Sequence, residues 1–220
     1  MSRSSARRPT PATRPIPARP TKSLPTSTDR PVAVAITGPV GAGKSAALEA
    51  FARHGAATIS SDETVHRLLR KDPHVRRELE ERFGPDVIGD DGADRAKLAE
   101  IVFSDPNQLD WLEELLHPLV VSENLRWQEE VASRPDPPLL TVTEVPLLYE
   151  TGAASRFDAV VVITAPEDVR RARRPVDDER EQRLIPESEK VALADFAYVN
   201  DRSLDELDAF VAGVIRQLTA

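Results

Sequence analysis

The sequence lacks cysteine altogether, and it has one methionine and few aromatic residues among its 220 positions. Without cysteine, disulfide bonds and thiolate metal sites are excluded. Long apolar runs are also missing, so no segment reaches the length of a membrane-spanning helix, and we expect no membrane partner. Hydrophobic residues nevertheless make up 40% of the chain, which is enough to build the core of one α/β domain.

Positive charge is scarce outside the N-terminus. Residues 1–30 contain seven Lys or Arg and one acidic residue, whereas the remaining positions contain 22 basic and 36 acidic residues. Contacts along a nucleic acid require a basic face, so the acidic body argues against nucleic-acid binding. A single nucleotide is a different case, because backbone amides and one lysine can hold its phosphates locally.

The first 30 residues are rich in Pro, Ser, Thr, Arg and Ala and have almost no large apolar side chains. Such a segment buries too little surface to offset the entropy cost of ordering, so we predict a disordered tail over residues 1–30. A transit peptide is the alternative, since the segment is rich in Arg and Ser and poor in acids. Its frequent prolines would break the amphipathic helix that such a peptide needs, which favours the plain tail.

Strand-like and helical segments alternate over residues 31–220, which we interpret as one domain. Short apolar runs, several of them rich in β-branched residues, predict five strands, at Val32–Thr37, Ala56–Ile59, Leu139–Val145, Ala159–Thr164 and Phe196–Val199. Strands separated by helices form a parallel sheet that is covered on both faces, so the expected fold is α/β with three layers. Residues 63–134 are predicted to be a mostly helical insertion outside that sheet.

A glycine-rich loop follows the first predicted strand. The residues Gly38-Pro39-Val40-Gly41-Ala42-Gly43-Lys44-Ser45 fit the pattern G-x-x-x-x-G-K-[ST], and Ala46 continues a helix predicted over Ser45–His54. Glycines let successive amides point at a phosphate, Lys44 adds a charge for the β- and γ-phosphates, and the Ser45 hydroxyl suits Mg²⁺. A chance glycine-rich turn would not need the strand before it and the helix after it. We therefore predict a P-loop NTPase fold that binds a nucleoside triphosphate.

Two carboxylates follow predicted strands, at the sheet edge where the active-site groups of parallel sheets gather. Asp62 comes after the second strand, and Glu144 lies near the end of the third. A phosphoryl-transfer site needs a group that orients the acceptor hydroxyl and groups that hold the metal. Asp62 fits the first role, although an acidic residue that caps a helix or lies in its first turn fits the sequence equally well. Glu144 is interpreted as a ligand of Mg²⁺ or of its water network.

From Val32 onward the chain resembles the dephospho-CoA kinase family. The matching segments span the body in the family's order. They are Ile36–Ser45, Ile59–Asp62, Arg82–Gly84 with Asp94-Arg95 and Ile101–Phe103, Leu115–Leu119, Val145–Glu150 and Leu193–Asp201. The Leu-His-Pro-Leu segment at His117 and the Val-Pro-Leu-Leu-x-Glu segment at Val145 are the specific ones, because other P-loop kinases do not combine them at this spacing.

The resemblance implies ATP-dependent phosphorylation of the 3′-hydroxyl of dephospho-CoA, giving CoA and ADP, with Mg²⁺, in a monomeric cytoplasmic protein. It makes Asp62 the catalytic base that takes the proton of that hydroxyl. The insertion at 63–134 would bind the acceptor, with Arg95, His117 and Pro118 in its site. A buried histidine at a helix end is an equally good interpretation of His117.

The resemblance also assigns the nucleotide side of the site. Lys44 and the loop amides would share the developing phosphoryl charge with Mg²⁺ and an arginine of a lid. The lid is expected at residues 168–186, where Arg173 matches the family's first lid arginine and Arg180 a later one. The other arginines there are expected to form a solvated helix face. Asn200 would lie near the adenine of ATP.

Two features depart from the family pattern. Ser60 stands where an aspartate is usual, which removes one negative charge near the metal. The lid is several residues shorter than usual, Pro175 interrupts its helix, and Leu184 stands in place of a glutamine. Two alternatives therefore stay open. One is a related kinase for another small hydroxylated metabolite, and the other is a paralogue that binds nucleotide without transferring phosphate.

Overall fold

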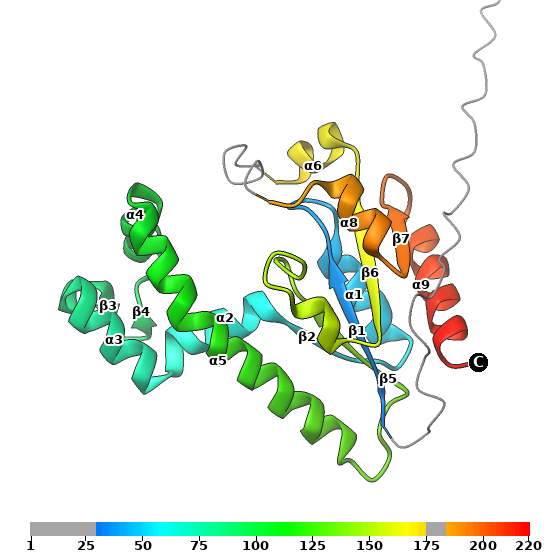
Figure 1. Cartoon of the computed structure of the whole chain (residues 1–220), viewed down its shortest axis with the longest axis horizontal. Coiled ribbons are helices and arrows are strands. Elements are labelled where there is room, and N and C mark those ends of the chain that lie inside the picture. Colours follow the sequence, from blue (N-terminus) through cyan, green and yellow to red (C-terminus); the bar gives the residue numbers. More distant parts are fainter. Residues whose placement is uncertain (1–29, 175–183) are drawn as a thin grey trace, which may run out of the picture.

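Figure 1 shows the computed structural model of the chain, which describes residues 30–174 and 184–220. Five parallel strands form its central sheet, in the order β2-β5-β1-β6-β7. Their bounds are Val32–Thr37 (β1), Ala57–Ser60 (β2), Leu140–Glu144 (β5), Ala159–Thr164 (β6) and Phe196–Val199 (β7). The predicted five-stranded parallel sheet is confirmed, whereas the expected tail lies outside the described residues except for Arg30.

One face of the sheet is covered by helices α1 (Lys44–Arg53) and α9 (Leu204–Leu218). Val34 and Ile36 of β1 pack on this face in one cluster with Phe51 of α1, and all three side chains are fully buried. Successive side chains of a strand point to opposite faces, so a strand covered on both sides is apolar at nearly every position. This is why β1 stands out in the sequence as a continuous apolar run.

The opposite face is covered by the segment that follows β5, including the 3-10 turn η2 (Ala153–Arg156), and by α8 (Glu187–Leu193). Leu148 and Phe157 of that segment pack in one cluster with Val162 of β6. A further helix, α6 (Glu167–Arg173), follows β6. The two covered faces give the three layers that the sequence predicted.

Between β2 and β5 the chain leaves the sheet and builds a second hydrophobic core, in what we call the helical region (residues 61–132). Leu79, Leu98 and Leu116 come from different helices and are buried together there. Its elements are α2 (Ser61–Lys71), α3 (Pro73–Phe83), η1 (Pro85–Val87), β3 (Ile88–Gly89), β4 (Gly92–Ala93), α4 (Arg95–Ser104) and α5 (Pro106–Ala132). The hairpin β3–β4 was not predicted, because strands of two residues leave no periodic pattern.

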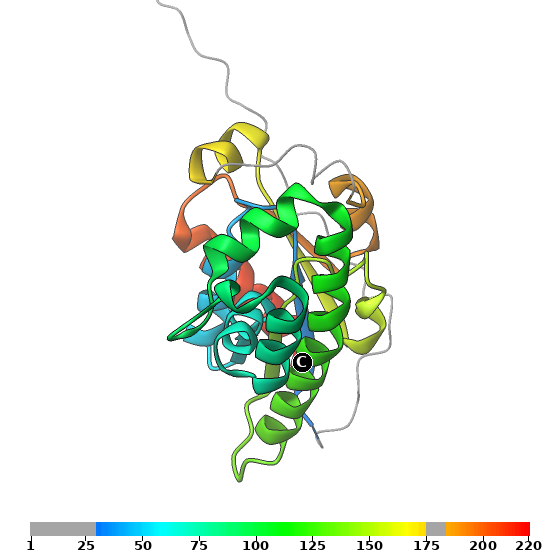
Figure 2. The same ribbon diagram turned by 90° about the vertical axis from the view of Figure 1, so that its left-hand side faces the viewer.

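Helix α5 connects the helical region to the sheet. It spans 27 residues, continues through Pro118, and begins behind Asp105, whose side chain accepts a hydrogen bond from the backbone N–H of Asn107. Figure 2 looks onto the helical region, with α5 running down the view in green, and α5 contacts β5 of the sheet. Among residues 30–174 and 184–220, no helix combines the length and the apolar content needed to cross a membrane.

Candidate active site

The P-loop joins β1 to α1, and its shape depends on glycine. Gly38, Gly41 and Gly43 have φ angles of 144°, 78° and 93°, which residues with a Cβ rarely adopt. A Cβ at Gly41 would lie 2.6 Å from the carbonyl oxygen of Arg170, and one at Gly43 would collide with Nδ2 of Asn200. The turn therefore requires glycine both for its backbone angles and for the close approach of its neighbours.

Lys44 is the first residue of α1, and its side chain folds back over the loop. Its Nζ donates to the carbonyl oxygen of Pro39 at 3.1 Å and lies 4.0 Å from Oε1 of Glu144. Burial lowers the pKa of Lys44, and the Glu144 carboxylate opposes that shift. Burial likewise raises the pKa of Glu144, and Lys44 opposes it. Both groups have lost much of their hydration, so an ion bound beside them would interact strongly with them.

Glu144 and Ser60 end neighbouring strands, and the register of the sheet pairs them. Ser60 is buried, and a hydrogen bond from its side chain lowers the pKa of Glu144 against the larger raising effect of burial. A neutral hydroxyl thus lies beside Glu144 at the position where the family pattern usually has an aspartate. Asp62 follows in the first turn of α2. Its side chain is exposed and lines a cleft between the P-loop and the helical region.

A single cleft of about 1370 Å³ joins the P-loop to the helical region. Its walls come from the loop, the carboxyl ends of strands, the arginines that follow β6, and helices α4 and α5. The predicted site residues on these walls are Gly38, Pro39, Val40, Gly41, Gly43, Lys44, Ser45, Asp62, Arg95, His117, Glu144 and Arg173. Those that lie off the walls are Ala42, Ala46, Pro118 and Asn200.

Arg95 and His117 lie on the helical side of the cleft, and both are exposed. His117 is in the interior of α5, so the alternative interpretation of a buried histidine at a helix end is wrong. Pro118 is exposed on the same helix but does not line the cleft. Phe103, which is 62% exposed, gives this wall an apolar surface beside its polar groups.

Arg173 and Asn200 both bind the backbone of the P-loop. Arg173 ends α6 (Glu167–Arg173), and its guanidinium donates to the carbonyl oxygens of Gly41 at 3.3 Å, Ala42 at 3.4 Å and Asn200 at 3.0 Å. The buried side chain of Asn200 donates from Nδ2 to the same Ala42 oxygen at 2.8 Å. In this structure both side chains hold the backbone of the nucleotide loop, an arrangement that the sequence did not predict.

Two further residues on the cleft walls were missed by the sequence analysis as site residues. Arg174 follows α6, and its positive charge adds to the lowering of the pKa of Lys44. The arginine-rich run could have pointed to it. Asn124 lies on α5, where no sequence signal distinguishes it. Residues 175–183, which include Pro175 and Arg180, lie outside the described residues, so the expected lid is seen only at its two ends.

The residues beside the loop fit a Mg²⁺ ion that arrives with a nucleotide. Among the described residues no group of three or more His, Cys, Asp or Glu side chains could hold a metal ion by itself. Mg²⁺ needs no such group, because it commonly takes one or two protein oxygens together with phosphate oxygens and water. Ser45 and Glu144 both line the cleft, and they supply a hydroxyl and a carboxylate of this kind.

Comparison with known proteins assigns the same family along most of the chain. The sequence model described as dephospho-CoA kinase matches residues 32–206. The dephospho-CoA kinase of Mesorhizobium japonicum is 35% identical over 195 residues, which cover 85% of this chain and 96% of the relative. That of Chlamydia abortus is 36% identical over 182 residues, which cover 79% of this chain and 90% of the relative.

Solved structures agree with the fold. The crystal structure of TT1252 from Thermus thermophilus has a TM-score of 0.69 and 31% identity, covering 87% of this chain and 100% of that one. Dephospho-CoA kinase from Campylobacter jejuni has a TM-score of 0.64 and 24% identity, covering 85% and 96%. The second likeness concerns the fold alone.

Proposed function

The chain belongs to the dephospho-CoA kinase family, and we propose that it transfers the γ-phosphoryl group of ATP to the 3′-hydroxyl of dephospho-CoA. The family predicted from the sequence is confirmed, and with it the class of the enzyme, a kinase with an alcohol group as acceptor. The observation that most supports the proposal is the single cleft, whose walls include the P-loop, Asp62 and helices α4 and α5. It offers room for two substrates whose reacting groups meet beside Asp62.

The P-loop side is suited to hold the phosphates of ATP. Its amides and the Lys44 ammonium bind the β- and γ-phosphates, and Arg173 keeps the loop backbone in place. Ser45 and Glu144 are the residues that would hold Mg²⁺, which supplies positive charge against the phosphates when it is bound. The protein therefore contributes position and charge rather than covalent chemistry.

Asp62 is the proposed base at the other end of the reaction. As the acceptor oxygen bonds to the γ-phosphorus and the bond to ADP breaks, the hydroxyl proton passes to the Asp62 carboxylate. A first-turn acid is also favourable for a helix, and Asp62 does lie in the first turn of α2. Its exposure to the cleft supports the catalytic role beside that structural one.

The helical region is the proposed acceptor site. Arg95 offers a guanidinium to the diphosphate of dephospho-CoA, and His117 lies on the same side of the cleft. Phe103 provides an apolar surface for the uncharged part of the acceptor. The expectations of a monomer, of a cytoplasmic location, and of no nucleic-acid or membrane partner belong to this proposal as well.

A coupled assay of ADP release tests the proposal. ATP and Mg²⁺ are supplied with dephospho-CoA, with CoA, whose 3′-oxygen is already phosphorylated, with shikimate, with a nucleoside monophosphate, or with no acceptor. We expect rapid release only with dephospho-CoA. Faster turnover of another acceptor would favour the related-kinase alternative, and ATP binding without acceptor-dependent release would favour the paralogue that only binds nucleotide.

A further inference from the structure

The contact between α2 and α5 lies directly beside Asp62. Asn124 of α5 donates from Nδ2 to Oγ of Ser61 at 3.3 Å, and Ser61 is the residue before Asp62. Ser61 is only 7% exposed and, like Asn124, lines the cleft, so this bond lies where α2 and α5 meet at the cleft wall. A side-chain bond from α5 thus reaches the first residue of the helix that carries the proposed base.

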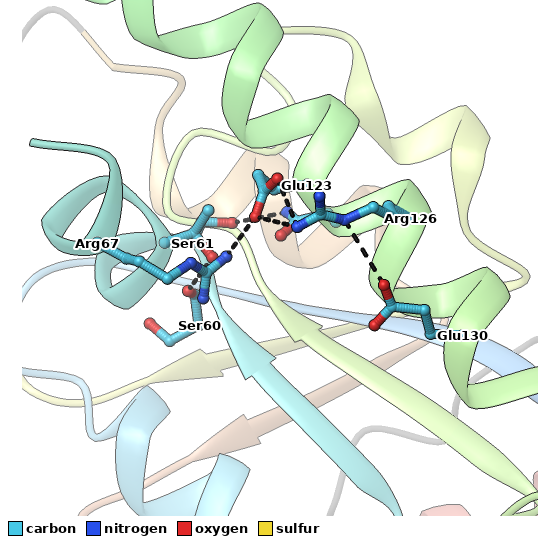
Figure 3. A network of polar contacts seen from close by, with 8 residues as sticks. Ser60, Ser61, Arg67, Glu123, Arg126 and Glu130 are labelled. Carbon is cyan, nitrogen blue, oxygen red and sulfur yellow. Dashed lines mark hydrogen bonds and ion pairs between the residues drawn. The ribbon is translucent and has the colours of Figure 1, made fainter. Parts of the chain in front are cut away.

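A second link joins the same helices next to the first. Nη2 of Arg67, on α2, lies 2.8 Å from Oε2 of Glu123, the neighbour of Asn124 on α5. Arg126 lies 2.7 Å from the other oxygen of Glu123, so this carboxylate is held between two guanidinium groups (Figure 3). The two links join α5 to α2 at neighbouring positions of α5.

Asp62 depends on such neighbours for its position. Within the described part of the chain its exposed carboxylate forms no hydrogen bond or ion pair, so it is accessible to a substrate in the cleft. The turn before it is held from the sheet side, because Ser60 pairs with Glu144 and the Thr64 hydroxyl donates to the Ser60 carbonyl oxygen at 3.1 Å. Asn124 holds it from the acceptor side.

The Asn124 amide is also incompletely satisfied. Its Oδ1 is buried and has no hydrogen-bond partner among the described residues, although the side chain lies on the cleft wall. A buried amide oxygen without a partner destabilises a fold, and an apolar side chain would avoid that cost. The described contact of this amide is therefore the bond from its nitrogen to Ser61, at the point where α5 reaches α2.

We propose that Asn124 is a positioning residue for Asp62, because it ties the first turn of α2 to the acceptor helix α5. An acceptor that binds along α5 is thereby placed in a fixed relation to the carboxylate that takes its proton. Small displacements of a base from its substrate reduce the rate strongly, so such a tie affects turnover by keeping Asp62 in place. The inference rests on the proposed function, since it needs Asp62 to act as the base.

The test uses the full chain with ATP, Mg²⁺ and dephospho-CoA, and compares Asn124→Ala, Ser61→Ala and the double variant. Each single substitution should lower kcat about tenfold and leave the KM for ATP within about twofold of wild type. Because both remove the same bond, the double variant should be no slower than the slower single variant. Fully additive losses, or a loss that appears only in the KM for ATP, would overturn the proposal.

Ser122→Ala is the matched control. Ser122 lies on α5 two residues before Asn124; it is exposed and does not line the cleft, and its side chain forms no hydrogen bond within the described residues. The substitution removes one hydroxyl, as Ser61→Ala does, and kcat should stay within about twofold of wild type. If Ser122→Ala is as slow as Asn124→Ala, the effect belongs to α5 in general and the proposal is overturned.

Asp62→Asn is measured alongside, so that a failure of the proposed base can be distinguished from a failure of the positioning role of Asn124. If it keeps normal turnover, Asp62 is not the base and both ideas fall. If it is inactive while Asn124→Ala and Ser61→Ala turn over normally, only the positioning role is wrong. Thermal unfolding of each variant shows the folded fraction, and Ser61→Ala, which removes one oxygen, keeps the test decisive if Asn124→Ala does not fold.

Discussion

The two sides of the cleft hold their site residues in different ways. On the sheet side, the side chains of Lys44 and Glu144 are only 11% and 7% exposed, and the loop backbone and the strand register fix them. On the helical side, Asp62, Arg95 and His117 are all exposed. Their positions depend on how helices pack on one another. The phosphate site therefore rests on the P-loop and the sheet, whereas the acceptor site rests on the α2–α5 contact.

Asp62→Asn, on the helical side of the cleft, should give the largest effect, which is a loss of kcat. Losing a general base typically lowers kcat by roughly 10²–10⁴-fold, and ATP affinity should not change, because the phosphate site does not contain this residue. Stopped-flow or calorimetric ATP binding, together with steady-state kcat, measures both quantities. Glu63→Gln, which removes the neighbouring exposed carboxylate of α2, is the control and should turn over normally. An ATP affinity that falls as far as kcat would contradict the separation between the phosphate site and the acceptor site.

Gly43→Ala should instead weaken ATP binding, because this residue lies in the P-loop on the sheet side of the cleft. The added Cβ meets Asn200 and forces an unfavourable φ, so ATP affinity should fall roughly tenfold to a hundredfold. Gly55→Ala separates these causes, because Gly55 has a similar φ of 87° and nothing within 4 Å of the new Cβ. It should lose about 1–2 kcal/mol of stability and keep its ATP affinity. Equal loss of ATP binding in both variants would show that the loss does not come from the contact with Asn200.

Arg173→Met should have a smaller effect on the same side. It removes the hydrogen bonds to the carbonyl oxygens of Gly41, Ala42 and Asn200, so the loop becomes less rigid and the KM for ATP should rise about tenfold. Arg171→Met is the control, because that guanidinium bonds Glu167 on its own helix. The KM for dephospho-CoA should not change. A rise in that constant instead would place Arg173 on the acceptor side.

The smallest expected effect concerns pH. Burial holds the pKa of Glu144 above its ordinary value of 4.5. The folded protein therefore binds this proton more tightly than the unfolded chain, so the group makes the free energy of unfolding fall as pH rises from about 4.5 through the raised pKa. Glu144→Gln removes that contribution, and urea denaturation across this range should show a flatter pH dependence than in wild type. An unchanged slope would mean that other groups set it.

The sheet side was also the more predictable from sequence. Strands β1 and β6 begin and end where their apolar runs do, because burial on both faces leaves a continuous signal. The bounds of β7 also match the prediction, although this edge strand is only partly buried. The P-loop was readable because backbone chemistry demands glycine at fixed positions. The glycine pattern of this short segment therefore predicted the conformation of the loop between β1 and α1.

The parts that could not be predicted are contacts between distant positions. Asn200 reaches Ala42 across 158 residues of sequence, and Asn124 reaches Ser61 across 63. Neither partner has a local pattern that specifies the other, since the packing of whole helices decides which side chains meet. The exposure of His117 likewise depended on the face that α5 turns toward the core. Family resemblance located such residues without showing what they bind.

Pro118 gives α5 a defined mechanical weakness. A helix of 27 residues is about 40 Å long, and α5 connects the acceptor side of the cleft to the sheet as one continuous element. Proline has no N–H to donate to the carbonyl oxygen of Glu114, so one turn of this helix lacks a backbone hydrogen bond, and such turns are where helices bend most easily. His117 belongs to that turn. Any flexing of α5 between an empty and an occupied cleft would therefore pivot beside the histidine on its wall.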